Sequence, residues 1–478
     1  MPTARFKAAE QPGSTLKIII LGAGRVGESV AESLVSEHND ITVVDTDIHQ
    51  LAALQDRLDL RTVPGNGTHP TILEKAGAAD ADMLIATAAK DETNLVACQI
   101  GAKLFNIPTR IARIRAPEFQ EHPEVTGDGG FYVDHLICPE QTVCDYIFKL
   151  IEFPEALQVL EFADGRASLI AVRAYAGGPL VQHPIRDLRQ YHPKVDVRVV
   201  AIFRGDRAIA PDAEATIESG DEVFLLAASE HIRTALSDLR RTDKPVRRIM
   251  IAGGGNIGLR LARALGTRYE VKVIEAQQER CEYLASQLPS STLVLSGDST
   301  NEELLADEGV DEMDLFLALT NDDENNIMSC MLARRMGARR VIALINRKAY
   351  AELMLGSRID IAIVPAQTTI GQLLTHVRRG DIVAVHSLRR GAAEALEAIA
   401  HGDAKSSKVV GRRIEEIELP KGATIGAVVR KRSDGNSDVL IAHHDTVIES
   451  EDHVIVFLAN KRSIPQVEKL FQVGVRFF

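Results

Sequence analysis

The sequence has no long apolar run and few cysteines. Its longest apolar stretches, such as KIIILGAG and DVRVVAIF, are far shorter than the ~20 residues that a membrane-spanning helix requires. The five cysteines form no CxxC pair and no zinc-ligand spacing, which is typical of free thiols in a reducing cytosol. The first fifteen residues lack the apolar core of a signal peptide. We therefore expect a cytoplasmic protein whose association with a membrane, if any, is peripheral.

Several catalytic motifs are also absent. The sequence contains no G-x-S-x-G elbow, Walker A loop, HExxH helix or clustered His/Cys metal site. The formal net charge of −12 would repel a nucleic-acid backbone. We expect no metal, no catalytic residues, no nucleic-acid partner, and a protein that is not an enzyme.

What is present is a chain of 478 residues that repeats itself once. KIIILGAGRVGESVAESL near the start returns as RIMIAGGGNIGLRLARAL, and Gly22 and Gly253 are 231 positions apart. IESGDEVFLLA and IESEDHVIVFLA, which begin at Ile217 and Ile448, are separated by the same 231 positions. Because a fixed interval indicates internal repetition, an entire two-part module has been duplicated.

Each module predicts two kinds of domain. β-branched runs alternate with amphipathic helical patterns in the first part, which predicts βαβ units and a Rossmann-like parallel sheet. Short strands and turns follow, which predict a small α+β domain. The predicted fold class is therefore α/β, a tandem duplication of these two domains. The predicted boundaries are a disordered N-terminal extension 1–15, Rossmann-like domains 16–137 and 246–364, and small domains with connector helices 138–241 and 365–478.

A connector helix is expected between the two parts of each module, beginning at Pro139 and Pro365, where the missing N–H of proline costs least. In the first connector, apolar residues recur on one face: Val143, Ile147, Leu150 and Ile151. This face could pack within its module or against another subunit.

The strongest motif is the glycine-rich turn after the first strand. Gly22 permits a tight turn, Gly24 lets the backbone approach a pyrophosphate, and Gly27 allows close packing of helix on strand. Asp45 ends the next strand, where its carboxylate can accept hydrogen bonds from both ribose hydroxyls and would repel a 2′-phosphate. NAD or an adenine nucleotide is favoured.

The second module repeats this arrangement, which makes chance a poor explanation. Its glycines and acid are Gly253, Gly255, Gly258 and Glu275. Gly254 replaces Ala23, so we expect the second loop to be less encumbered and the second site to differ in affinity or nucleotide preference.

Further candidates follow later strands. Asn66 and Asp298 could bond an adenine edge, although Gly, Asn and Asp also form ordinary turns. Arg113 ends another strand and is partly matched by Arg347. Its guanidinium could reach phosphates or a neighbouring carboxylate. The alternative is a salt bridge at a subunit interface. Acids such as Asp91 suit the first turn of the following helix. The predicted cofactor-binding residues are Gly22, Ala23, Gly24, Arg25, Val26, Gly27, Asp45, Asn66, Ala88, Ala89, Arg113, Gly253, Gly254, Gly255, Asn256, Ile257, Gly258, Glu275, Asp298 and Thr320.

From Leu16 onward the chain resembles the TrkA-type regulatory subunits of bacterial Trk potassium-uptake systems, which are built from RCK (KTN) modules. The resemblance is carried by KIIILGAGRVGESVAE, GTHPTILEKAGAADADMLIA, DETNLVACQIGAKLFNIPTRIARIR, GGGNIG, LTNDDENNIMSCMLARRMGARRVIALINR and IVPAQTTIGQLL. Two departures stand out. Ala88 occupies a place where the family usually has threonine, as at Thr320, and the family begins near Lys17, so the N-terminal extension is unexplained.

The resemblance implies two RCK modules per chain and assembly into a ring, a tetramer of eight modules. It further implies docking on the cytoplasmic face of a TrkH-like potassium-conducting protein of the inner membrane, and gating of potassium flow by ATP, ADP and NAD(H). Our own hypothesis is that Arg25 and Arg113 sense the bound phosphates.

Two other functions fit part of the sequence. An NAD-dependent oxidoreductase shares the glycine fingerprint, but the small domains offer no catalytic proton donor, and duplication of a cofactor domain suits a ring of sensors better. An RCK regulator of a different ion transporter also fits, because the modules do not name the pore.

Overall fold

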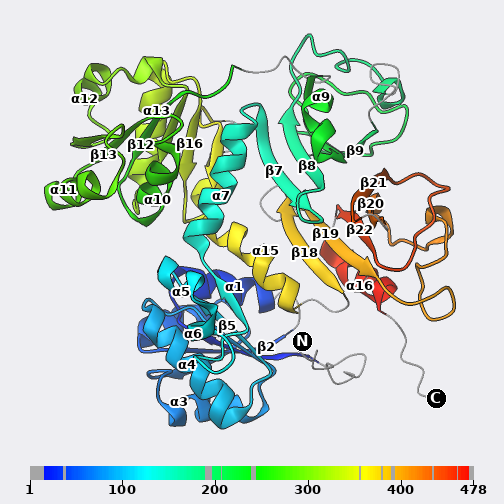
Figure 1. Ribbon diagram of the computed structural model, residues 1–478, viewed down its shortest axis with the longest axis horizontal. Coiled ribbons are helices and arrows are strands. Elements are labelled where there is room, and N and C mark those ends of the chain that lie inside the picture. The colour runs from blue at the N-terminus through cyan, green and yellow to red at the C-terminus, as the bar shows by residue number, and fades with distance from the viewer. Residues whose placement is uncertain are drawn as a thin grey trace. The chain divides into compact units, whose positions relative to one another are not determined.

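The computed structural model describes residues 15–35, 39–188, 196–205, 207–237, 244–354, 357–377, 381–388, 393–432, 435–459 and 461–472 (Figure 1). Nearly all of the predicted N-terminal extension lies outside the described residues. The chain divides into two compact units, Met1–Glu140 with Ala366–Leu373 and Phe477–Phe478, and Gln141–Pro365 with Leu374–Arg476.

The first Rossmann-like domain, for which nucleotide binding is predicted and which we call the first nucleotide domain, contains a six-stranded parallel sheet with the order β3-β2-β1-β4-β5-β6. This order is that of the six-stranded Rossmann sheet, which agrees with the predicted Rossmann-like fold. Its central strand β1 reads KIIIL and is buried along almost its whole length, as expected for a parallel strand covered on both faces. Its strands are β1 (Lys17–Leu21), β2 (Asp40–Asp45), β3 (Arg61–Pro64), β4 (Met83–Ala86), β5 (Thr109–Arg113) and β6 (His135–Ile137). Its helices are α1 (Arg25–Val35), α2 (Ile48–Gln55), α3 (Pro70–Lys75), α4 (Asp91–Phe105), α5 (Pro117–Glu121) and α6 (Pro123–Thr126).

The second nucleotide domain repeats this topology in the order β14-β13-β12-β15-β16-β17, again all parallel (Figure 1). Its strands are β12 (Arg248–Ala252), β13 (Glu270–Glu275), β14 (Leu293–Ser296), β15 (Leu315–Ala318), β16 (Val341–Leu344) and β17 (Ile361–Ile363). Its helices are α10 (Asn256–Leu265), α11 (Gln278–Gln287), α12 (Glu302–Asp307), α13 (Asp323–Met336) and α14 (Lys348–Leu353). The predicted duplication is confirmed strand by strand.

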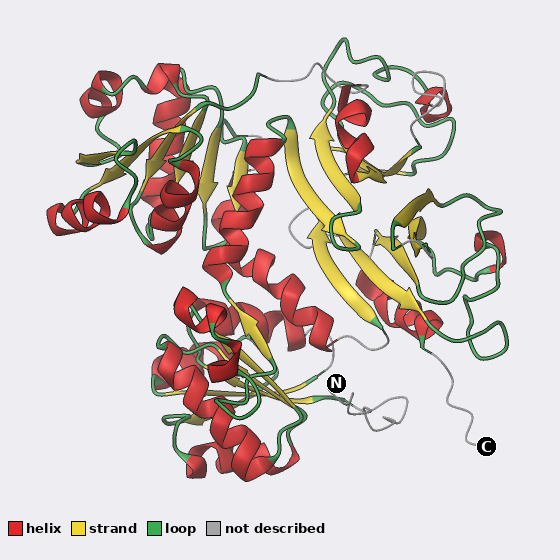
Figure 2. Cartoon of the chain, viewed as in Figure 1, coloured by secondary structure: helices red, strands yellow, loops and turns green. Residues whose placement is uncertain are grey.

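Each small domain contains a five-stranded antiparallel sheet, ordered β10-β9-β11-β8-β7 in the first and β21-β20-β22-β19-β18 in the second (Figure 2). The first comprises β7 (Ala156–Phe162), β8 (Ala167–Arg173), β9 (Val197–Arg204), β10 (Arg207–Ile209), β11 (Glu222–Ala228) and α9 (Ile232–Ser237). The second comprises β18 (Ile382–Leu388), β19 (Ala393–Ala400), β20 (Ala423–Lys431), β21 (Ser437–Ile441), β22 (Asp452–Leu458) and α16 (Ile464–Phe471). The α+β prediction is therefore confirmed for both.

The repeated turn before the last strand of each small domain is held by a buried aspartate. Asp221 accepts hydrogen bonds from Arg204 at 2.9 Å and from the Glu218 amide at 2.8 Å. Burial acts to raise the pKa of Asp221, but these hydrogen bonds outweigh it and hold the pKa below its ordinary value. Asp452 and Arg430 form the equivalent pair at 2.7 Å. This motif is structural in both modules.

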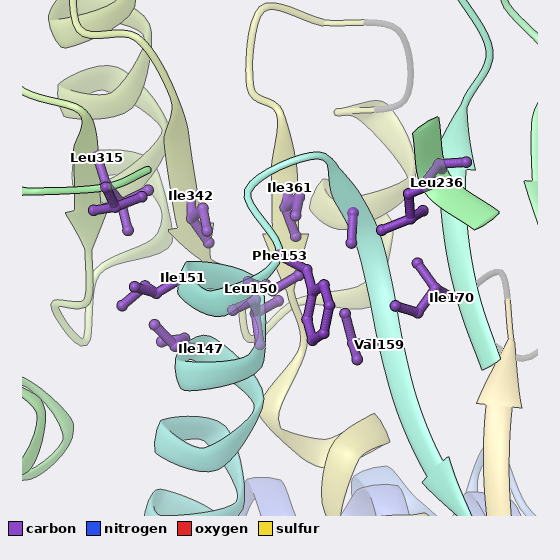
Figure 3. Packing of buried hydrophobic residues seen from close by; sticks show 14 of the residues in the cluster. Ile147, Leu150, Ile151, Phe153, Val159, Ile170, Leu236, Leu315, Ile342 and Ile361 are labelled. Atoms are coloured by element: carbon purple, nitrogen blue, oxygen red, sulfur yellow. The ribbon is translucent and has the colours of Figure 1, made fainter. Parts of the chain in front are cut away.

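The connector helices α7 (Pro139–Glu152) and α15 (Pro365–Val377) begin at the predicted prolines. The apolar face of α7 is buried in a core that also contains Ile249, Ile342 and Ile361 of the second nucleotide domain (Figure 3). The guanidinium of Arg340 donates to the Leu150 carbonyl at 3.0 Å near the end of α7. The helix therefore packs beyond its own module, against the following module of the same chain.

The two small domains also share a core, which includes Phe162 and Phe224 from the first and Leu388 and Phe457 from the second. The buried Glu397 carboxylate accepts a hydrogen bond from the Ala163 amide at 2.8 Å across this contact. Among the residues that the structure describes, no helix is both long and apolar enough to traverse a bilayer. The described part of the chain also holds no group of His, Cys, Asp and Glu side chains arranged for a metal ion.

Candidate nucleotide-binding sites

The first glycine-rich turn has the geometry that its three glycines predict. Gly22 has a φ of +104°, which favours glycine, and a Cβ on Gly27 would lie 1.8 Å from the Gly22 carbonyl oxygen. A Cβ on Gly24 would meet nothing within 4 Å, so the space above this residue is open. The Glu28 amide donates to the Gly24 carbonyl at 2.8 Å and starts helix α1, with Arg25 exposed and Val26 half-buried in its first turn. The helix N-terminus thus faces the open space, as an anion site requires.

The second turn has the same geometry. Gly253 has a φ of +107°, and a Cβ on Gly258 would lie 2.0 Å from the Gly253 carbonyl oxygen. The space above Gly255 is again open. Asn256 and Ile257 open helix α10. Both turns can therefore accept a pyrophosphate.

The acid after each second strand holds the glycine turn. Asp45 Oδ2 accepts the Ala23 amide at 2.6 Å, and Asp45 Oδ1 accepts the Asp47 amide at 2.8 Å. Glu275 makes the same pair of contacts, from the Gly254 amide at 2.9 Å and the Gln277 amide at 3.0 Å. Because a carboxylate has about four lone-pair sites, each acid can still accept ribose hydroxyls.

The expectation that Gly254 leaves the second loop less encumbered is wrong. A Cβ at this position would lie 2.2 Å from Leu284 Cδ1 and 3.1 Å from Glu275 Oε2. Leu284 is fully buried in helix α11. The space that a methyl group at position 254 would need is therefore taken by the Leu284 side chain, and it lies close to the Glu275 carboxylate.

Asn66 and Asp298 each form the turn after the third strand. Asn66 Oδ1 accepts the amide and hydroxyl of Thr68 at 3.0 and 2.9 Å, and Asp298 Oδ1 accepts those of Thr300, both at 2.8 Å. The hydrogen bonds from Thr300 lower the pKa of Asp298. One oxygen of each side chain is thus engaged in the turn, which is the alternative that the sequence left open.

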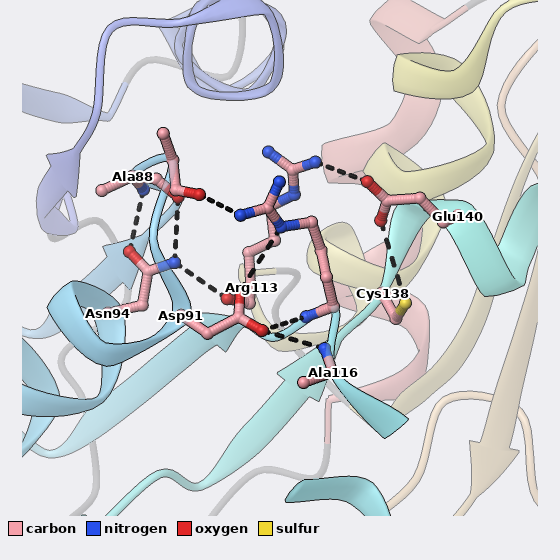
Figure 4. A network of polar contacts seen from close by, with 9 residues as sticks. Ala88, Asp91, Asn94, Arg113, Ala116, Cys138 and Glu140 are labelled. Atoms are coloured by element: carbon pink, nitrogen blue, oxygen red, sulfur yellow. Dashed lines mark hydrogen bonds and ion pairs between the residues drawn. The ribbon is translucent and has the colours of Figure 1, made fainter. Parts of the chain in front are cut away.

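Asparagines that sequence analysis did not single out hold the loop after the fourth strand. The buried Asn94 accepts the Ala88 amide at 2.8 Å and donates to the carbonyls of Ala88 and Arg113 at 3.1 and 2.8 Å (Figure 4). Asn326 repeats all three contacts, with Thr320 and Leu344. The Thr320 hydroxyl lies 2.7 Å from Asn326 Oδ1, a contact that Ala88 cannot make. The same asparagine recurs in DETN and DENN, and this repetition is the feature of the sequence that could have identified it.

The first-turn acids Asp91 and Asp323 bind backbone rather than solvent. Asp91 Oδ2 accepts the Arg115 and Ala116 amides at 2.8 and 2.9 Å. Asp323 accepts the Asn346 and Arg347 amides, both at 2.8 Å. Each acid therefore fixes the loop that follows the fifth strand of its sheet.

These contacts also correct one equivalence. Since Asp91 and Asp323 bind matching amides, Arg347 corresponds to Ala116, and the residue that corresponds to Arg113 is Leu344. Arg347 is exposed and pairs with Glu324 at 2.8 Å. The second site therefore has no arginine at the position of Arg113.

Charge is the main difference between the two sites. We call four positions around the first site its rim; they carry cationic side chains, namely Arg25, Lys90, Arg113 and Arg115. The same positions of the second module, its own rim, carry Asn256, Asp322, Leu344 and Asn346.

Two arginines contact the loops of the sites: Arg280 lies outside the rim positions, and Arg115 belongs to the first rim. Arg280 Nε donates to the Gly254 carbonyl at 2.8 Å, where the first module has Gln50. In the first site the Ala89 carbonyl accepts a hydrogen bond from the Arg115 guanidinium. Arg280 is a contact that sequence analysis missed, because it follows the predicted acid by five positions and matches no fingerprint.

Comparison with known proteins agrees with this architecture. The TrkA-N domain model matches residues 18–139 and 249–365, and the TrkA-C domain model matches 169–240 and 404–472. The chain is 55% identical over 458 residues to the Trk system potassium uptake protein TrkA of Vibrio alginolyticus, covering 96% of this chain and 99% of the relative. It is 56% identical over 463 residues to the protein of the same name from Halomonas elongata, covering 97% and 100%.

A solved structure shows the same fold. The crystal structure of the GsuK RCK domain superposes with a TM-score of 0.59 at 18% identity and covers 98% of each chain. The relatives carry the name of a potassium-uptake protein and not of an enzyme. With both domain models matched twice and close relatives over nearly the full length, the chain belongs to the TrkA family.

Proposed function

We propose that this chain is the nucleotide-sensing regulatory subunit of a potassium-uptake system. In this proposal it assembles as a cytosolic ring, a tetramer, on the cytoplasmic face of a TrkH-like conducting protein in the inner membrane, and binding of ATP, ADP and NAD(H) gates potassium flow. The relatives' names supply the transport system. The carrying observation is that both glycine turns keep open space above Gly24 and Gly255, beside Asp45 and Glu275.

The rims indicate how the two sites divide the ligands. Four cations around the first site favour ligands with a terminal polyphosphate, since charge-assisted hydrogen bonds to phosphate are the strong ones. The second rim has no cation and favours a dinucleotide, whose charge lies on a pyrophosphate that the glycine turn itself can bind. We therefore assign ATP and ADP to the first site and NAD(H) to the second.

The test is calorimetric titration of the full chain with ATP, ADP and NADH, repeated on Gly24→Asp and Gly255→Asp. Both substitutions place a carboxylate where phosphate would bind, and neither added Cβ meets another atom within 4 Å, so the fold should survive. Each variant should lose one class of site and keep the other. Matched Gly24→Ala and Gly255→Ala controls separate the effect of charge from that of the added carbon.

A second measurement addresses the partner. The chain, co-expressed with a TrkH-like membrane protein, should co-purify with it, and potassium flux through the complex in vesicles should change with added ATP or NADH. Steady turnover of either nucleotide by the chain alone, or flux that ignores both, would contradict the proposal.

A further inference from the structure

A part-buried ion pair joins the first nucleotide site to the connector helix α7. Arg113 ends strand β5, and Glu140 is the second residue of α7; Arg113 Nη2 lies 2.7 Å from Glu140 Oε1 (Figure 4). The two side chains are only 17% and 12% exposed. Arg113 Nε is also buried and has no hydrogen-bond partner within the described residues, so the guanidinium keeps a donor unused.

The second module replaces this pair as a set. Leu344 stands where Arg113 does, because Asn326 donates to its carbonyl just as Asn94 donates to that of Arg113, each at 2.8 Å. Ala366 follows Pro365 as Glu140 follows Pro139. Complete loss of only one partner would leave a part-buried charge uncompensated, which is destabilising. Arg113 and Glu140 therefore form a coupled pair that is present in the first module and replaced at both positions in the second.

Arg113 also belongs to the first site's ligand edge. It lies at the carboxyl end of its strand, the edge where open parallel sheets bind ligands. Asn94 bonds both Arg113 and Ala88, so these two residues are held together. A terminal phosphate at this edge offers more negative charge than one carboxylate oxygen and can use the unpartnered Nε as well.

We propose that the Arg113–Glu140 pair is a switch by which a polyphosphate in the first site acts on α7: phosphate takes the Arg113 guanidinium and releases Glu140. This inference rests on the proposed function, since it requires a nucleotide at the first site. A ligand shifts a conformational equilibrium only through its different affinities for the two states, and competition for one guanidinium provides that difference.

The released residue lies in a helix that is fixed further along. Val143, Ile147, Leu150 and Ile151 of α7 are buried in the core that contains the second nucleotide domain. Freeing Glu140 therefore releases the first turn of a helix whose later turns are buried in that core. In this way a terminal phosphate on the bound nucleotide would affect the second module through α7.

Calorimetric ATP titration of the full chain tests the competition, in a Gly255→Asp background that silences the second site. Glu140→Gln should raise ATP affinity about tenfold, because one charge-assisted contact no longer competes for Arg113. In an Arg113→Leu, Glu140→Ala variant, which copies the second module and should fold, ATP should bind more weakly than in the unsubstituted protein. Glu118→Gln removes an exposed first-turn carboxylate from α5 and should change affinity less than twofold.

Hydrogen exchange of the second turn of α7, whose amides donate to the carbonyls of the first turn, gives the second readout. ATP should accelerate exchange there in the unsubstituted protein, and Glu140→Gln should show fast exchange without ATP. If ATP binds normally but Glu140→Gln changes neither affinity nor exchange, the switch is wrong and nucleotide sensing stands. If the unsubstituted chain binds no nucleotide, the proposed function fails, and the switch fails with it.

Discussion

The two nucleotide domains keep the same backbone and differ in the side chains around it. The glycine turn, the acid that accepts its amide and the asparagine that closes the fourth loop are repeated contact by contact. These features cannot vary freely, because a Cβ on Gly27 or Gly258 would overlap a carbonyl oxygen. The rims carry four cations in one module and none in the other. The comparison teaches that both modules kept the backbone contacts of a nucleotide site, while the charge of the side chains around the site diverged.

The largest effect is expected when the first site receives the residues of the second. The variant combines Arg113→Leu, Arg115→Asn and Glu140→Ala, the last to avoid an unpaired buried acid. Loss of two charge-assisted hydrogen bonds at about 1.5–3 kcal/mol each should weaken ATP binding by about 100-fold or more. NADH binding at the second site should not change. Calorimetry measures the ATP affinity of this variant, with Gly24→Asp measured alongside. A loss of ATP affinity smaller than about fivefold would show that the rim does not set the ligand preference of the two sites.

Cysteine labelling compares the two domains without altering either site. Cys98 and Cys330 occupy equivalent buried positions, and burial raises the pKa of Cys98 to about 12 and also raises that of Cys330. Because thiolates are the reactive form, both should label only when their domain opens. ATP at about 100 times its Kd should slow Cys98 by roughly 100-fold, and NADH should do the same to Cys330.

Mass spectrometry of the labelled peptides reads each thiol separately. The sharp outcome is that each nucleotide protects one cysteine. If either nucleotide slows both thiols equally, the two sites are not specialised, whatever their rims carry.

Much of this arrangement follows from local sequence, and the rest does not. The parallel βαβ sheet and the three roles of the glycines could be predicted because periodicity and steric limits act within a few residues. The contact of α7 with the following module could not, since an apolar face indicates burial but not its partner. The pairing of Arg113 with Glu140 joins positions 27 apart, and only the fold shows that Leu344 is its counterpart.

A smaller effect separates the two glycine loops. Gly254→Ala should destabilise the second domain by about 1–3 kcal/mol, because its Cβ would overlap the fully buried Leu284 side chain, an overpacking effect. Ala23→Gly in the first loop removes a methyl group and should cost no more than ~1 kcal/mol. Thermal unfolding of both variants measures the contrast. Adding Leu284→Ala to Gly254→Ala should give less destabilisation than the sum of the two single changes, and strict additivity would show that the overlap is relieved elsewhere.

The smallest effect concerns the hydroxyl that only the second site has. Thr320 Oγ1 lies 2.7 Å from Asn326 Oδ1 and accepts the Asp322 amide at 3.2 Å. Thr320→Ala should cost about 0.5–1.5 kcal/mol of stability, the net value of one neutral hydrogen bond. Ala88 shows that the loop closes without this hydroxyl, so NADH affinity should fall by no more than the same free energy, roughly two- to tenfold. Ala88→Thr supplies the reverse comparison: a gain in ATP affinity there would mean that the hydroxyl contacts ligand in both sites, whereas an unchanged affinity confines its role to the second loop.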